Sequence, residues 1–301
     1  MPNDAEGGAA GRAGRLPNDE NSGERELFRA YATGRAAMYA FILGGGAAFS
    51  LGASQRSPLA MLAGPGAVVG LVILVSAIAA SRAAADRFYR SFASEFGLSY
   101  AERSEPLPLT PLLGAGDKRW CEHWMRGTLP GQPSFSGGVG HFVFEEIERK
   151  RGNSGLQTDH VTERRRFTLC TIDLEPSLPF FKGLYVRPRR GIFPEGKDWV
   201  RHGDSRTLEL ESADFARRYE VRIASDQEEL MARQLLAPTL VNWLAEHPLQ
   251  PCFEAKAGTL AVYVPKPLTD AGNLTYLLDA SRHLAERVLR ETEEALARPA
   301  A

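Results

Sequence analysis

The chain has 301 residues, of which 36 are basic and 37 acidic, so its formal net charge is -1. This length accommodates a membrane segment and one domain of about 200 residues, which can bury a core without disulfide bonds. The balanced charge excludes the broad positive field that draws a protein onto nucleic acid, and we therefore expect no nucleic-acid partner.

The first third of the chain contains two uncharged runs that predict a membrane anchor. Residues 1–23 are polar, with Asn, Gly, Pro and acidic groups, so we expect a disordered tail rather than a signal peptide. The uncharged runs follow at 36–54 and 59–81, separated by the polar break QRSP. At about 1.5 Å per residue, such helices cross most or all of a hydrocarbon core about 30 Å thick. Residues 24–82 are therefore predicted to form a transmembrane helical hairpin; the alternative is a buried hairpin of a soluble protein.

The basic residues beside this hairpin predict its orientation. Only Arg56 lies between the two runs, whereas three arginines precede the first run and three follow the second, namely Arg25, Arg29, Arg35, Arg82, Arg87 and Arg90. Because basic residues favour the cytoplasmic side, we expect a multi-pass protein of the inner (plasma) membrane with both termini cytoplasmic. The three arginines after the second run are also candidate lipid contacts, since anionic headgroups attract them.

Small residues recur at a four-residue spacing inside both runs. They are Gly44, Ala48 and Gly52 in the first run and Gly66 and Gly70 in the second. Such stripes let helix backbones approach closely, either within the hairpin or between the copies of a homo-oligomer. Neither run contains an ionisable residue, which argues against an ion or proton pathway.

A juxtamembrane helix is predicted over residues 83–97. Phe88, Phe92 and Phe96 lie four residues apart, on one face of a helix that ends at Gly97. We expect this helix to extend from the membrane and to dock on the following domain. The alternative is a helix that lies in the membrane interface, with its arginines on anionic lipid.

Residues 98–301 are predicted to form a soluble α+β domain. A Pro-rich linker opens it, and short strand-like runs bounded by Gly, Pro, Asn or Asp follow. Tyr219, Val221 and Ile223 alternate as in a half-buried strand, a helix after it is interrupted at Pro238, and two strands are hinged at Gly258. A last amphipathic helix begins near Asn273. We expect a mostly antiparallel sheet packed with two or three helices.

One part of this domain is similar to a known family. Phe215, Tyr219, Val221 and Asp226, then LLAPTLVNWL and CFEAKAGTLAVYV, resemble a domain of unknown function in uncharacterised bacterial membrane proteins with two transmembrane helices. The resemblance covers roughly residues 208–264. It implies this architecture and a membrane address, and it brings no catalytic motif.

The residue patterns predict no catalytic, cofactor or metal site. Cys121, Cys170 and Cys252 are too few and too widely spaced for a disulfide framework, and we expect buried thiols. Cys121 and His123 have no second pair at ligand spacing, and GNSG around Ser154 does not match the nucleophile elbow. A basic run adds Arg187, Arg189 and Arg190 to the candidate lipid contacts, although arginines beside strands also pair with glutamates.

These observations favour a membrane-anchored cytoplasmic domain that is not an enzyme and that binds a protein partner or the membrane surface. One alternative is an enzyme of unrecognised type that acts on a membrane-proximal substrate, with a pocket lined by His141, Glu145 and Asp173. Another is an accessory subunit of an oligomeric transporter or channel. The lipid bilayer and an unknown protein are thus the expected partners.

Overall fold

The computed structural model describes residues 58–106, 109–151, 157–189 and 204–297, without the side chains of 58–74, 149–151, 157–158 and 188. The chain divides into two compact units, Met1–Ala85 and Asp86–Ala301, and each is described by itself. The expected tail and first apolar run lie outside the described residues, as do the candidate packing residues Gly44, Ala48 and Gly52.

Helix α2, Pro58–Glu95, contains both the second uncharged run and most of the expected juxtamembrane helix. Gly66 and Gly70 lie in α2, within residues 58–74, for which the structure describes the helix but not the side chains. Among the residues that the structure describes, no helix combines the length and apolar character needed to cross a membrane.

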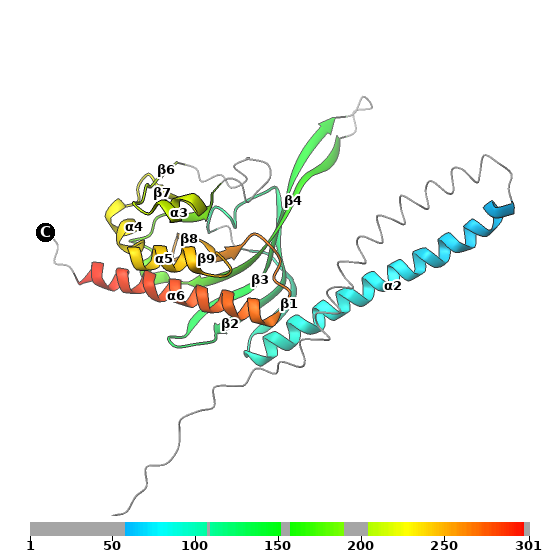
Figure 1. Ribbon diagram of the computed structural model, residues 1–301, viewed down its shortest axis with the longest axis horizontal. Coiled ribbons are helices and arrows are strands. Elements are labelled where there is room, and N and C mark those ends of the chain that lie inside the picture. The colour runs from blue at the N-terminus through cyan, green and yellow to red at the C-terminus, as the bar shows by residue number, and fades with distance from the viewer. Residues whose placement is uncertain (1–57, 107–108, 152–156, 190–203, 298–301) are drawn as a thin grey trace, which may run out of the picture. The chain divides into compact units, whose positions relative to one another are not determined.

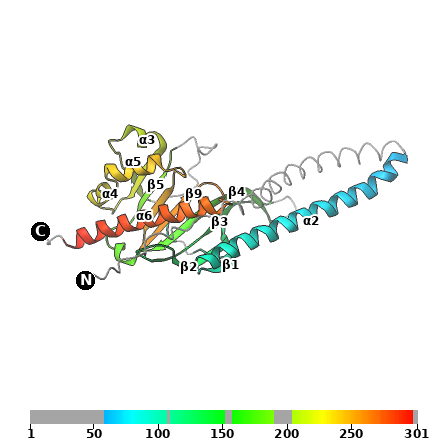
Figure 2. The ribbon, with the colours of Figure 1, turned by 60° about the horizontal axis from the view of Figure 1, so that its bottom comes forward.

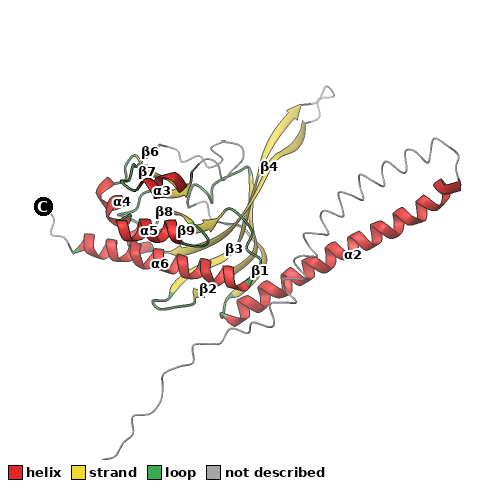
Figure 3. Ribbon diagram, viewed as in Figure 1, coloured by secondary structure: helices red, strands yellow, loops and turns green. Residues whose placement is uncertain are grey.

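The second unit is an α+β fold built on one antiparallel sheet of nine strands (Figures 1 and 3). Their order across the sheet is β1-β2-β3-β4-β9-β8-β5-β7-β6. The strands are β1 (Ser99–Ser104), β2 (Lys118–Leu129), β3 (Phe135–Arg151), β4 (Gln157–Asp173), β5 (Leu184–Pro188), β6 (Ser205–Thr207), β7 (Tyr219–Ala224), β8 (Cys252–Lys256) and β9 (Thr259–Val264). The expected α+β class with a mainly antiparallel sheet is therefore confirmed.

Helices gather on one face of this sheet, which we call the helix face (Figure 2). The longest helix of the second unit, α6, packs on β4 and β9, and Ser281 of α6 is buried there and donates to the Leu277 carbonyl of the same helix. The helices are α3 (Ala213–Arg218), α4 (Glu229–Leu235), α5 (Pro238–Glu246) and α6 (Ala271–Leu296), with a 3-10 turn, η1, at Glu175–Ser177. Asp270 caps α6, because its carboxylate accepts a hydrogen bond of 2.8 Å from the amide of Asn273.

The opposite face of the sheet also carries core residues. The segment 109–115 covers part of it, with Leu112 and Leu113 buried and the Leu112 amide 2.8 Å from a carboxylate oxygen of Glu254. Since both faces are covered, the central strands are apolar on both sides, as in the buried run Val139–Phe144 of β3.

Several local predictions match the structure. The alternating run at Tyr219 forms β7, and the β8–β9 hairpin turns at Ala257 and Gly258, both of which have a positive φ, 52° and 69°. Pro238 opens the new helix α5, as expected for a residue without a backbone N–H.

Other local predictions differ. Strands β1 and β2 flank the expected linker at 104–120 and overlap its ends, and most of their residues lie where we predicted no strand; β6 is only three residues long. Asp226 is exposed, and the residue that precedes α4 is Glu228, which makes no side-chain capping hydrogen bond. Instead, the buried Gln227 accepts from the amide of Lys182 and donates to the carbonyl of Phe180, so it ties this turn to the start of β5.

Candidate functional site

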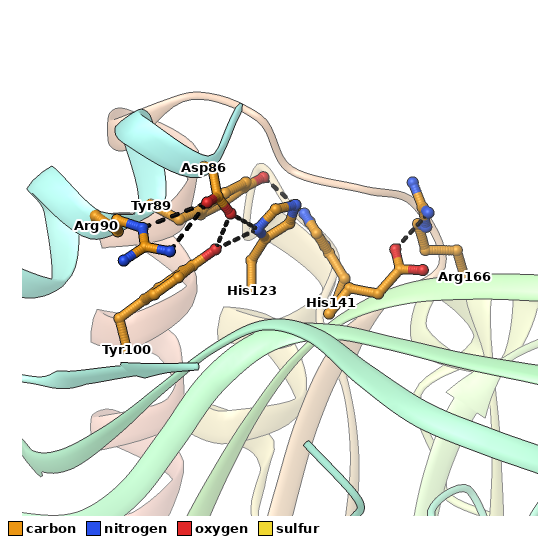
Figure 4. Close-up of polar contacts among 8 residues, drawn as sticks. Asp86, Tyr89, Arg90, Tyr100, His123, His141 and Arg166 are labelled. Carbon is orange, nitrogen blue, oxygen red and sulfur yellow. Dashed lines mark hydrogen bonds and ion pairs between the residues drawn. The ribbon is translucent and has the colours of Figure 1, made fainter. Parts of the chain in front are cut away.

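The end of α2 meets the sheet through a cluster of polar side chains, which we call the helix–sheet cluster (Figure 4). It consists of Asp86, Tyr89 and Arg90 from α2, Tyr100 from β1, His123 from β2 and His141 from β3. All six belong to the second unit, Asp86–Ala301. The cluster therefore joins four elements of the same compact unit.

The last turns of α2 are fixed on the sheet mainly by apolar packing. Phe88, Tyr89 and Phe92 are buried, and the Phe88 and Tyr89 rings meet edge to face at 4.8 Å. Gly97, at φ 67°, then reverses the chain, and the Leu98 amide donates to the Ala93 carbonyl at 2.8 Å. This left-handed glycine terminates the helix and leads directly into β1.

The outer half of the cluster centres on the carboxylate of Asp86. The Tyr100 hydroxyl donates to one of its oxygens, and the Arg90 guanidinium donates to the other at 3.1 and 3.3 Å. Nδ1 of His123 lies 2.8 Å from the Tyr100 hydroxyl and 3.6 Å from Asp86. Asp86, which is partly exposed, thus accepts hydrogen bonds from two side chains and lies beside a third.

A β-bulge places His123 in this cluster. Glu122 pairs with His141 and Met125 with Val139, so β2 has one extra residue at this point. His123 has the unusual backbone conformation at this bulge, with φ 51° in the left-handed region. As a result, His123 and its neighbour Glu122 both lie on the helix face, where the His123 ring stacks on Tyr89 at 4.5 Å.

In the inner half of the cluster, Tyr89 and His141 contact each other, and His141 lies beside Thr168 of β4. The Tyr89 hydroxyl lies 2.6 Å from Nε2 of His141 and donates to the Leu268 carbonyl at 3.0 Å. Because the hydroxyl has one proton, a neutral His141 that donates from Nε2 satisfies both contacts. Nδ1 of His141 lies 3.2 Å from the Thr168 hydroxyl, which also accepts from the Leu268 amide at 2.7 Å.

The surroundings keep the rings of this cluster neutral. Burial lowers the pKa of His141 to about 3, and burial also lowers the pKa of His123, although Asp86 acts in the opposite direction. Burial raises the pKa of both Tyr89 and Tyr100. The hydrogen bond from Tyr100 lowers the pKa of Asp86, and Arg90 adds to this effect. The only charged pair within the cluster at neutral pH is therefore Asp86 with Arg90.

A second set of charges lies next to the cluster, around Glu122. Its carboxylate accepts from Arg166 and from the indole of Trp120, the latter at 2.9 Å, and lies 3.6 Å from Arg164. The guanidinium groups of Arg103 and Arg164 lie over the Trp120 ring, 4.6 and 5.2 Å from its centroid. The basic run at Arg164–Arg166 therefore pairs largely with acidic and aromatic side chains of the sheet.

The arrangement resembles a structural joint more than a reaction centre. Its titratable rings are neutral and engaged with one another, and none is an exposed base beside a nucleophile. Among the described residues, no group of three His, Cys, Asp or Glu side chains is placed to hold a metal ion. The thiol of Cys121 is buried, which raises its pKa to about 12 and keeps it protonated.

The candidate lipid-contact arginines lie on different elements of the chain. Arg82 and Arg87 are exposed on α2, and Arg90 pairs with Asp86. Arg187, on β5, pairs with Glu220 at 3.1 Å, and exposed Arg189 donates to the Ala216 carbonyl at 2.5 Å; Arg190 lies outside the described residues. Since β5 is far from β1 in the strand order, the β5 arginines are separate from those at the end of α2.

The residues suggested for an enzyme pocket are also separated. His141 and Glu145 lie on the same face of β3 because they are four residues apart in a regular part of the strand. Thr168 of β4 pairs with His141, and Asp173 is five residues further along β4. Asp173 therefore lies on the opposite face of the sheet, and the three side chains do not converge.

Sequence reasoning missed the helix–sheet cluster itself. Its members are spread from Asp86 to His141 and meet only after four elements assemble. The glycines of SGGVG in β3 mark a different contact, because Trp124 lies against Gly138 and Gly140 on the opposite face of the sheet.

Comparisons with known proteins were made for the whole chain. No family model matches it, and no curated protein matches it. Among solved structures, the crystal structure of the mycobacterial trehalose monomycolate transport factor A, TtfA, matches with a TM-score of 0.45 and 14% sequence identity. The alignment covers 69% of this chain and 95% of that chain. At this level of similarity we draw no conclusion about this protein from the match.

Proposed function

We propose that the chain is a membrane-anchored, non-enzymatic domain that binds a protein partner at the cytoplasmic side of the inner membrane. The anchor is the hairpin of the runs 36–54 and 59–81, with both termini cytoplasmic. The resemblance over residues 208–264 to domains of two-helix bacterial membrane proteins agrees with this proposal.

One observation carries the anchor proposal. Residues 75–80 of α2 are all exposed and uncharged, with Val75 and Ile78 exposed by 56% and 37%. An exposed run without charged residues, in which Val, Ala and Ile predominate, is typical of a segment that is covered by lipid or by other helices. The charged residues resume immediately afterwards at Arg82.

The helix–sheet cluster supports a binding rather than a catalytic role. Tyr89 and Asp86 hold the last turns of α2, from Asp86 onward, on β1, β2 and β3, so these turns are part of the domain itself. We infer that the domain presents a fixed surface to its partner. The membrane surface is the less favoured target, since Arg187 and Arg189 are engaged within the domain.

Substitutions in the second run test the anchor. Leu71→Arg together with Val75→Arg introduces two charges, each of which costs about 3 kcal/mol at the centre of a membrane helix. We expect the wild type to remain in the membrane fraction after carbonate extraction and the double variant to be released or degraded. Val161→Arg, at an exposed position of β4, is the matched control and should remain in the membrane. A wild-type chain that carbonate extracts would contradict the proposal.

Photo-crosslinking in cells tests the partner. A photoreactive residue at Tyr276 or Leu230, both exposed by more than half, should give a discrete adduct if these surfaces face a partner. A set of such probes that covers every exposed element and yields no adduct would argue against a protein partner.

A further inference from the structure

A cavity on the opposite face of the sheet, away from the helix–sheet cluster, has the composition of a ligand site. Its volume is about 100 Å³, and it lies between the end of β1, the start of β2, β3, β4 and the β8–β9 turn. Its lining includes Glu105, Trp124, Arg126, Thr171 and Asp173. A space of this size holds a compact chemical group rather than a whole large ligand.

The aromatic wall of the cavity is held in a fixed place. Trp124 lies against β3 where the strand has glycines: a Cβ on Gly138 would come within 2.4 Å of the indole atom Cζ2. At Gly140, a Cβ would lie 3.0 Å from Cε3 of the same ring. Because these two glycines have no side chains, the indole of Trp124 packs directly against the backbone of β3. Part of the ring lines the cavity.

The charges in the cavity are not neutralised by one another. Glu105, Asp173 and Arg126 are exposed side chains at the edge of the cavity, and within the described part of the chain none of the three forms an ion pair or a side-chain hydrogen bond. Two carboxylates and one guanidinium give the wall a net charge of one negative unit at neutral pH. An indole face attracts a cation through its ring quadrupole, so the aromatic and the acidic groups favour the same kind of ligand.

We propose that this cavity binds a small ligand through an ammonium group. The indole of Trp124 contacts the cation, Asp173 and Glu105 supply the opposing charge, and the Thr171 hydroxyl is available as a hydrogen-bond acceptor. Arg126 opposes the cation and limits the affinity. This inference goes beyond the proposed function, because it does not depend on the membrane anchor or on a protein partner.

The test uses the full-length chain in a neutral maltoside detergent. Tetramethylammonium chloride is titrated by calorimetry at constant ionic strength, with potassium chloride and the neutral isostere tert-butanol as control titrants. We expect saturable binding of tetramethylammonium in the millimolar range and no saturable signal from either control. No saturable binding of tetramethylammonium or of methylammonium, or equal binding of tert-butanol, would overturn the proposal.

Substitutions that remove a charge with little change in side-chain size test whether tetramethylammonium binds in this cavity. Asp173→Asn and Glu105→Gln should each weaken tetramethylammonium binding by about two- to ten-fold, because each removes one attractive charge. Arg126→Gln should strengthen it by a similar factor, and Glu209→Gln, an exposed carboxylate elsewhere, should leave it unchanged. Thermal unfolding confirms that each variant is folded, and the two carboxylate variants serve as independent checks. Unchanged affinity in both, or weaker binding by Arg126→Gln, would contradict the assignment.

Discussion

The hydroxyl of Tyr89 lies 2.6 Å from Nε2 of His141, and the two rings meet edge to face at 5.3 Å between centroids. Tyr89 lies in α2 and His141 in β3, 52 residues apart in the sequence, and both are almost fully buried. This contact closes the inner half of the helix–sheet cluster. The stability of the joint between α2 and the sheet should therefore depend on it.

Tyr89→Phe should destabilise the domain by about 1–3 kcal/mol, because it removes the phenol and leaves His141 and the Leu268 carbonyl with one partner fewer in a buried site. Chemical denaturation of the full chain in detergent measures the free energy of unfolding. Tyr276→Phe is the matched control: Tyr276 is exposed by 54%, and its change should stay within about 0.5 kcal/mol. Equal effects of the two variants would contradict a supporting role for the Tyr89 hydroxyl.

The neutral state of His141 makes stability fall at acidic pH. Burial lowers its pKa to about 3, whereas an unfolded histidine titrates near 6.5, so the unfolded state binds the proton first as the pH falls. Between pH 7 and pH 5 this contributes a loss of about 2 kcal/mol in the free energy of unfolding. His141→Gln should show a shallower loss over this interval. A pH dependence that is identical in the two proteins would show that His141 is not buried as a neutral group.

Glu254 should act in the opposite direction. It is buried on β8 and accepts from the Leu112 amide, and burial raises its pKa to about 7 from an ordinary value of 4.5. The folded state then holds the proton more tightly, so stability is fully present below pH 4.5 and is lost as the pH rises through 7. Relative to Glu254→Gln, the wild type should lose about 2 kcal/mol between pH 5 and pH 8. A constant difference between the two proteins over this interval would rule out a carboxyl that titrates in the core.

Gly138→Ala should be destabilising by about 1–3 kcal/mol, because its Cβ would come within 2.4 Å of Trp124 and force the indole or the strand to shift. Gly272→Ala is the control: its Cβ would be 3.5 Å from Asp270, an ordinary contact, and alanine favours the helix α6 by up to about 1 kcal/mol. The two alanines should thus have opposite signs in a denaturation assay. Tolerance of alanine at position 138 would mean that Trp124 is not seated as described.

The parts of the fold that were predictable carry regular local patterns. Tyr219, Val221 and Ile223 alternate with polar residues and form β7, and Pro238 and Gly258 mark a helix start and a hairpin turn through their fixed or left-handed φ. These signals are properties of a few neighbouring residues, so the sequence displays them directly.

Strands β1 and β2 and the helix–sheet cluster lack such signals. Strand β1 carries Glu102 and Arg103 at its exposed centre, and the bulge in β2 puts Glu122 and His123 on the same face, which breaks the alternation of a regular strand. Asp86 and His141 become neighbours of the same site only through long-range packing. Their roles depend on tertiary contacts, and no short periodic pattern of residues in the sequence indicates such contacts.

The most direct test of the membrane proposal is a dual-reporter topology measurement. One fusion follows Ala301 and another is inserted at Gln55, in the break between the two uncharged runs. We predict that the fusion after Ala301 is active only as a cytoplasmic reporter and that the Gln55 fusion is active only outside the inner membrane. Activity of both fusions on the cytoplasmic side would contradict the hairpin, and an external reporter after Ala301 would contradict the proposed orientation.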